Sequence, residues 1–178
     1  MRRLLPILAL LGVVLMLNAQ GQEPDIIDWQ KYTPWQEKSL HDETSGGRTY
    51  RQLFGSPYCG GSVLARLVVK ADGSGDLVLK VQEIEKPSSI VRNARQLDSA
   101  DVNRFLTSVD RAQFWALPSN ETVKRYKDAA ICTLEGRDRG TYHGVRREVA
   151  SDHTAFDDAC TYFVKDAMTE MCRRRRMR

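Results

Sequence analysis

Residues 62–83, SVLARLVVKADGSGDLVLKVQE, decide the fold of this chain. Before the turn, apolar side chains recur at every second position, at Val63, Ala65, Leu67 and Val69. The segment 71–76, ADGSGD, has the glycines and aspartates of a tight turn, and a second strand is expected over 77–83. Two alternating runs on either side of such a turn predict a β-hairpin, whose strands pair in antiparallel fashion.

The segment after the hairpin predicts a third strand and then a helix. Residues 89–97 alternate more weakly than the hairpin, but they still favour a strand. Asp98 is a typical helix N-cap, and apolar residues follow at helical spacing, at Val102, Phe105, Leu106 and Val109. The segment 114–118, FWALP, is expected to end this helix and to fill part of the core.

The C-terminal part predicts a second hairpin and a final helix. Strands are expected at 129–135 and 141–148, on either side of the turn 136–140, GRDRG. One helix, capped by Ser151 or Asp152, is then expected from a continuous apolar stripe, formed by Phe156, Ala159, Cys160, Phe163, Val164, Ala167, Met168 and Met171. The order β-β-β-α-β-β-α predicts an α+β domain with an antiparallel sheet of about five strands and helices packed on one face.

The N-terminus is typical of a cleaved export signal. Arg2 and Arg3 precede an apolar run over 4–17, and Ala19 is a small residue suited to cleavage. The run is short for a bilayer, which needs roughly 20 apolar residues, so we expect cleavage rather than an uncleaved anchor. The predicted organisation is a signal peptide at 1–19, an irregular lead-in at 20–57, one α+β domain at 58–172 and a basic tail at 173–178. The protein is therefore expected in the periplasm or outside the cell.

The positive net charge of +4 comes from the two ends of the chain. Seven arginines lie in the signal and the last six residues, and removing these seven charges from +4 leaves −3 for residues 20–172. We expect the run Arg173, Arg174, Arg175 and Arg176 to be a solvated end, with attraction to a membrane surface as the alternative. Nucleic acid is not favoured, because no aromatic residues interleave the arginines.

The four cysteines of an exported chain predict two disulfides, for which three pairings exist. Cys160 and Cys172 lie 12 residues apart on the predicted final helix, about 18 Å, whereas a disulfide tolerates Cα separations of about 4.4 to 6.8 Å. If that helix runs back over the second hairpin, Cys160 lies level with Cys132. The predicted pairs are therefore Cys132 with Cys160 and Cys59 with Cys172.

Several residues of the second half resemble a known pattern. The segments FWALP at 114–118, LEG at 134–136, GTYH at 140–143 and Arg147 resemble the FWxLP…LEG…GxYH…R pattern of a group of uncharacterised exported, periplasmic bacterial proteins. This chain departs from the pattern at Ala129, Cys132 and Ala150, where the pattern has glycine, tryptophan and proline. The resemblance implies a continuous fold in this half and no particular activity.

No combination of residues in the sequence predicts catalysis or a cofactor. There is no G-x-S-x-G motif, no glycine-rich phosphate loop opens a helix, and no C-x-x-C pair exists. The histidines, His41, His143 and His153, lie on three different segments, so a metal site is not expected. The sequence therefore favours a protein that is not an enzyme.

The remaining candidates are binding residues on the second hairpin and beside it, namely Tyr142, His143, Arg147 and Trp115. Tyrosine and arginine often contribute much of the energy of protein interfaces. These observations favour a protein-binding module of the bacterial envelope, of the inhibitor or immunity-factor kind. The alternatives are an envelope hydrolase with a scattered site around His143 and Glu135 or Asp128, a structural accessory protein of the envelope, and purely structural roles for these side chains.

Overall fold

The computed structural model describes residues 37, 39–44, 46–83, 90–119, 129–149 and 154–177. Several sequence predictions lie outside these residues: the signal peptide at 1–19, the helix caps Ser151 and Asp152, and the candidate residue Asp128. In chain order the elements are the 3-10 helix η1 (Leu40–Asp42), β1 (Arg48–Ser56), β2 (Gly61–Val69), β3 (Gly75–Glu83), β4 (Ile90–Leu97), α3 (Ser99–Arg111), the 3-10 helix η2 (Phe114–Ala116), β5 (Ile131–Asp138), β6 (Thr141–Glu148), α4 (Ala155–Thr161) and α5 (Lys165–Arg176).

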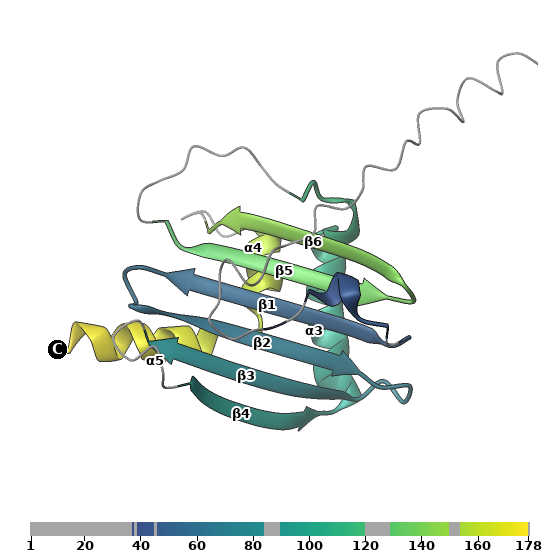
Figure 1. The fold of residues 1–178 in the computed structure, drawn as a ribbon, viewed down its shortest axis with the longest axis horizontal. Helices are drawn as coiled ribbons and strands as arrows, with labels where there is room; N and C mark the ends of the chain where they lie inside the picture. The colour runs from purple at the N-terminus through teal and green to yellow at the C-terminus, as the bar shows by residue number, and fades with distance from the viewer. Residues whose placement is uncertain are drawn as a thin grey trace, which may run out of the picture.

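All six strands belong to one antiparallel sheet with the order β4-β3-β2-β1-β5-β6. Helices α3, α4 and α5 lie along the same face of the sheet, behind it in the view of Figure 1, and β4 and β6 form its two edges. The predicted α+β architecture is confirmed, with six strands where the sequence predicted about five.

The additional strand is β1, which corrects the prediction that residues 20–57 form an irregular lead-in. It pairs with β2 on one side and with β5 on the other, so it joins the two predicted hairpins into one sheet. Both of its faces are covered: Tyr50, Gln52 and Phe54 turn toward the helices, and Thr49, Arg51 and Leu53 turn away, all of them buried. Polar residues on both faces mask the apolar alternation by which the other strands were found.

The core lies between the sheet and the helices. Helix α3 begins where the sequence predicts, because the Asp98 carboxylate accepts a hydrogen bond from the backbone N–H of Asp101 at 2.7 Å. Its apolar stripe, formed by Val102, Phe105 and Val109, is fully buried. The Phe105 ring packs against the edge of Tyr50 from β1, with centroids 5.2 Å apart. Residues 37 and 39–43 cover part of the opposite face, where the Leu40 side chain is completely buried.

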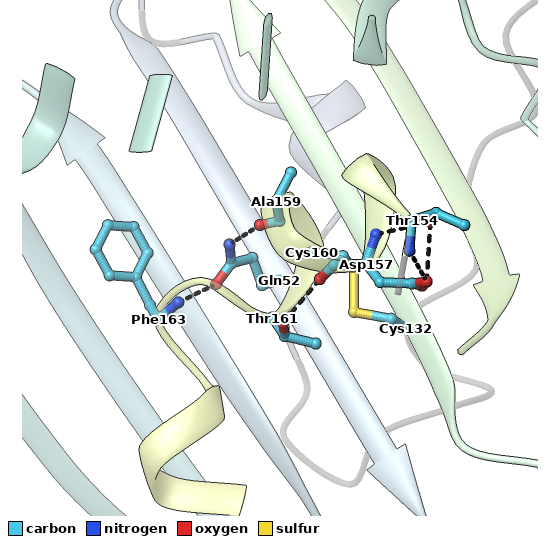
Figure 2. Close-up of a disulfide and its surroundings, with 8 residues drawn as sticks. All are labelled: Gln52, Cys132, Thr154, Asp157, Ala159, Cys160, Thr161 and Phe163. Atoms are coloured by element: carbon cyan, nitrogen blue, oxygen red, sulfur yellow. Dashed lines mark hydrogen bonds between the residues drawn. A yellow bond between two sulfur atoms is a disulfide. The ribbon is translucent and has the colours of Figure 1, made fainter. Parts of the chain in front are cut away.

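The final helix is interrupted, which corrects the prediction of one continuous helix. Helix α4 begins after Thr154, whose hydroxyl and backbone N–H form a capping box with Asp157. At residues 162–164 the Gln52 side chain inserts into the helical ladder: its amide donates to the Ala159 carbonyl at 2.6 Å, and its oxygen accepts from the Phe163 N–H at 3.1 Å (Figure 2). An uninterrupted helix would join those two backbone groups directly.

Two disulfides connect the sheet to the C-terminal helices. Cys132 of β5 bonds to Cys160 of α4 with a Cα separation of 6.1 Å, and Cys59, in the turn between β1 and β2, bonds to Cys172 of α5. These are the two pairs predicted from the sequence. The prediction assumed one straight final helix, and the interruption between α4 and α5 shows that this assumption does not hold. Disulfides of this kind are typical of proteins that fold in an oxidising compartment.

The arginine run is helical rather than a separate tail, because α5 extends to Arg176. On its exposed side Glu170 accepts from Arg173 and Arg174, each at 2.8 Å, and these hydrogen bonds lower the pKa of Glu170 to about 2. Within the described ranges, no helix is both long and apolar enough to span a membrane.

Candidate functional site

The four predicted binding residues do not share one surface. Along β6, Tyr142 turns toward the face away from the helices, whereas His143 and Arg147 turn toward the helices, opposite Gly136 and Cys132 of β5. Trp115 lies on η2 beside His143, with ring centroids 6.2 Å apart. The structure therefore brings His143 and Trp115 together and separates Tyr142 from them.

Tyr142 belongs to a buried polar network centred on Glu135. One oxygen of the Glu135 carboxylate accepts from the Tyr142 hydroxyl at 2.7 Å and from the Ser39 hydroxyl at 3.1 Å. The other accepts from Nε and Nη2 of Arg51 at 2.9 and 2.6 Å, and neither Glu135 nor Arg51 is exposed at all. Since both carboxylate oxygens are occupied and buried, Glu135 has no free access to a substrate in this arrangement.

The hydrolase hypothesis required His143 to work with Glu135 or Asp128. Glu135 and His143 project from opposite faces of the sheet, because Glu135 pairs with Gly144 and His143 pairs with Gly136. The geometry therefore does not bring these two groups together. Asp128 lies outside the described residues.

His143 sits in an aromatic cluster on the helix side of the sheet. Its ring contacts the Phe114 ring edge-on at 5.0 Å, and burial lowers its pKa, although the backbone carbonyl groups of Leu117 and Phe114 act in the opposite direction. A Cβ atom on Gly136 would lie 2.9 Å from Phe114 and 3.1 Å from Trp115. Glycine at this position lets the two aromatic rings pack directly on the strand, so segments 114–118 and 134–136 of the quoted pattern meet in one packing cluster.

Arg147 also has a packing role. Its guanidinium lies over the Phe156 ring of α4, 5.2 Å from the centroid.

Of the four predicted residues, Trp115 is the most accessible, with 37% of its surface exposed. Among the residues with assigned positions, no group of three or more His, Cys, Asp or Glu side chains could hold a metal ion.

A groove between the helices is a candidate site that the sequence analysis missed. It has a volume of about 590 Å³ and lies where the polar side of α3 faces the end of α4 and the start of α5. Its lining consists of Arg104, Thr107, Ser108, Arg111, Asp158, Thr161, Tyr162 and Lys165. The residues from α3 follow i, i+3, i+4, i+7 spacing, which is the only sequence signal for them. Their partners on α4 and α5 are 50 or so positions away and come close only in the fold.

The outer edge of β4 is a second candidate. Seven of its eight residues are exposed, and only Leu97 is buried. In the described part of the chain, β4 pairs with β3 alone. The opposite edge of the sheet differs, because the Arg146 N–H of β6 donates to the Ser119 carbonyl at 3.1 Å.

No protein-family model matches the chain, and a search of curated proteins finds no match either. The structural features that bear on function are therefore the groove, the β4 edge and the polar network.

Proposed function

We propose that this protein is an exported binding module of the bacterial envelope, which holds an extended acidic segment of another protein along the outer edge of β4. The observation that carries the proposal is the exposure of β4 over its whole length up to Leu97. A free strand edge presents a row of backbone donors and acceptors that an incoming strand can pair with.

Strand β4 is suited to this role by its length and regularity. It has eight residues without proline or glycine, and its register with β3 continues without a bulge from Ile90 to Leu97. Proteins that avoid strand addition usually shorten, bend or cover such an edge. Here the exposed side chains include Ile90 and Val91, which are 42% and 66% exposed and offer apolar contacts to a partner strand.

The charge of β4 indicates the chemistry of the partner. Arg92 and Arg95 project from opposite faces of the strand, and no acidic side chain of the described chain forms an ion pair with either of them. Next to Arg92 on β3 lies Lys80, which adds a third positive charge, partly offset by its ion pair with Glu37. Carboxylates on an added strand would face these arginines, and each opposite-charge pair across strands contributes about 0.2 to 1 kcal/mol.

The proposal includes export through the predicted signal at 1–19, with the mature chain beginning near Gln20. Export is supported by the two disulfides, which are typical of proteins in an oxidising compartment. Intact-mass measurement of protein from the envelope fraction tests this part. Since Glu135 and His143 lie on opposite faces of the sheet, we favour a binding module of the inhibitor or immunity-factor kind over a hydrolase.

Photo-crosslinking from β4 tests the binding proposal. The full chain with a photoreactive residue at Asn93 should capture a partner from envelope extract. The triple variant Val91→Lys, Arg92→Glu, Arg95→Glu should reduce its recovery at least about tenfold, the equivalent of 1.4 kcal/mol. Arg139→Glu is the matched control, since this arginine is 85% exposed and lies on the turn between β5 and β6.

All these variants should keep the wild-type melting temperature, because the changed side chains are exposed. Equal recovery with the triple variant would refute recognition through β4. A hydrolytic activity that disappears in His143→Ala would instead support the enzyme hypothesis.

A further inference from the structure

We propose that the groove between α3 and the α4–α5 junction binds a small sugar that carries an anionic group, either a phosphate or a carboxylate. This site is separate from the β4 edge and goes beyond the proposed protein-binding function. It rests on the charges, the free hydrogen-bonding capacity and the exposed ring that line the groove.

The cations in the groove define the position of the anionic group. Arg104, Arg111 and Lys165 contribute three positive charges and Asp158 one negative charge, which leaves a net charge of +2 on the lining. Arg104 is held by the Tyr162 hydroxyl and by Asp101, and both contacts raise its pKa. Within the described chain, Arg111 and Lys165 form no ion pair, so their charges remain available to a ligand.

The three serine and threonine hydroxyls in the groove require hydrogen-bond donors on the ligand. Each already donates its proton to a helix carbonyl: Thr107 to Asn103 at 2.8 Å, Ser108 to Phe105 at 2.6 Å and Thr161 to Asp157 at 2.7 Å. Their oxygen lone pairs, and the carboxylate of Asp158, remain as acceptors. An inorganic anion has few protons to offer them, whereas a sugar supplies several hydroxyl donors.

Tyr162 supplies a ring surface at the same place. It is 37% exposed, and its orientation is held by ring contacts with Phe105 at 5.6 Å and Phe163 at 5.0 Å. The apolar face of a sugar ring packs well on such an aromatic surface. The volume of about 590 Å³ falls within the usual range for small-molecule sites, about 300 to 1,000 Å³. Cations, acceptors and ring together match an acidic sugar better than a simple anion.

NMR titration of the full, disulfide-bonded chain with four probes tests the inference: glucose 6-phosphate, glucuronate, glucose and inorganic phosphate. The two anionic sugars should shift the amide signals of residues 104–111 and 158–165. Glucose and inorganic phosphate should bind at least about fivefold more weakly, since glucose lacks the anionic group and phosphate lacks the sugar ring and its hydroxyls. Added salt should weaken the binding of the anionic sugars, because the cations are exposed.

Arg111→Ala and Lys165→Ala should each weaken glucose 6-phosphate binding about fivefold, and Arg92→Ala on β4 should leave it unchanged. Both groove residues are exposed, so their replacement should not disturb the fold. Equal affinity for inorganic phosphate would reduce the groove to an unspecific anion patch and overturn the proposal. Equal affinity for glucose, unchanged binding in both variants, or no shift with any probe would overturn it as well.

Discussion

At the scale of single residues, buried polar side chains position the larger parts of this protein. Arg51 and Glu135 form an ion pair with no exposure, and the Glu135 carboxylate also receives the hydroxyls of Ser39 and Tyr142. Such a pair tolerates burial only when its remaining oxygens are hydrogen-bonded. The network therefore links the segment around Ser39 to β1, β5 and β6, and it accounts for Tyr142 in structural terms.

His143 gives a pH-dependent prediction at this scale. Burial lowers its pKa from the ordinary value of 6.5, so the folded imidazole stays neutral at a pH where the unfolded one is already protonated. The unfolded state then binds more protons, and the free energy of unfolding falls as the pH drops from about 7 through the folded pKa. Denaturant unfolding of the wild type and of His143→Gln at several pH values measures this, and the variant should lose less stability over that window.

The lowered pKa of His143 can be measured directly by NMR. The ring proton signals of His143 should titrate with a midpoint below 6.5. A midpoint at or above 6.5, or equal pH dependence in the variant, would contradict a neutral, half-buried imidazole.

At the scale of elements, the course of the C-terminal helices is set by one side chain from the sheet. Gln52 takes the place of the backbone hydrogen bond between Ala159 and Phe163, while the Val164 N–H turns to the Thr161 carbonyl at 3.0 Å. Because of the interruption, α5 does not continue the direction of α4. Its Cys172 is bonded to Cys59. Strand β1, which carries Gln52, therefore organises both the sheet and the helix layer.

Gln52→Leu should lower the free energy of unfolding by about 2 to 3 kcal/mol, because it leaves two buried backbone groups without their partner. Gln96→Leu on the exposed β4 is the matched control and should change stability by less than about 0.5 kcal/mol. Urea denaturation compares the two variants. A loss of less than about 1 kcal/mol in Gln52→Leu would mean that Ala159 and Phe163 re-form the helical hydrogen bond at little cost.

At the scale of the whole molecule, both disulfides connect the sheet layer to the C-terminal helices, and they close loops of different length. Cys59 and Cys172 are 113 residues apart in sequence, and Cys132 and Cys160 are 28 apart. Both bonds join the sheet side to the C-terminal helices, so together they hold the two layers of the domain. A disulfide restricts the unfolded chain more strongly when the loop that it closes is longer.

Removing the cysteine pairs separately should give a ranked loss of stability. Replacing Cys59 and Cys172 with alanine should cost about 4.8 kcal/mol, and replacing Cys132 and Cys160 about 3.6 kcal/mol, in the chain-entropy description. The Cys132 pair is also completely buried, so its loss adds a packing term that brings the two values closer. Reversible urea unfolding of each double variant under oxidising conditions provides both numbers. A larger loss for the Cys132 pair would show that packing rather than loop closure dominates.

Much of the fold follows from local signals that the sequence displays by itself. The β2–β3 hairpin, the cap at Asp98 and the stripe on α3 are each specified within a dozen or so neighbouring residues, through alternation, turn residues and helix capping. The candidate sites are different. The groove joins α3 to Tyr162 and Lys165, and the exposure of β4 depends on which strand ends the sheet.

The sequence alone therefore determined the α+β class, the first hairpin and helix α3, because periodicity and capping act over short distances. The two predicted disulfide pairs are confirmed, but the continuous final helix from which they were deduced is not, since Gln52 interrupts it. Only the tertiary structure decided that residues 48–56 form the central strand, that Gln52 interrupts the final helix, and that Tyr142 points away from His143. Each of these results comes from contacts between residues far apart in the chain. Local propensity has no information about such contacts, since a buried polar residue on β1 becomes favourable only when its distant partner is in place.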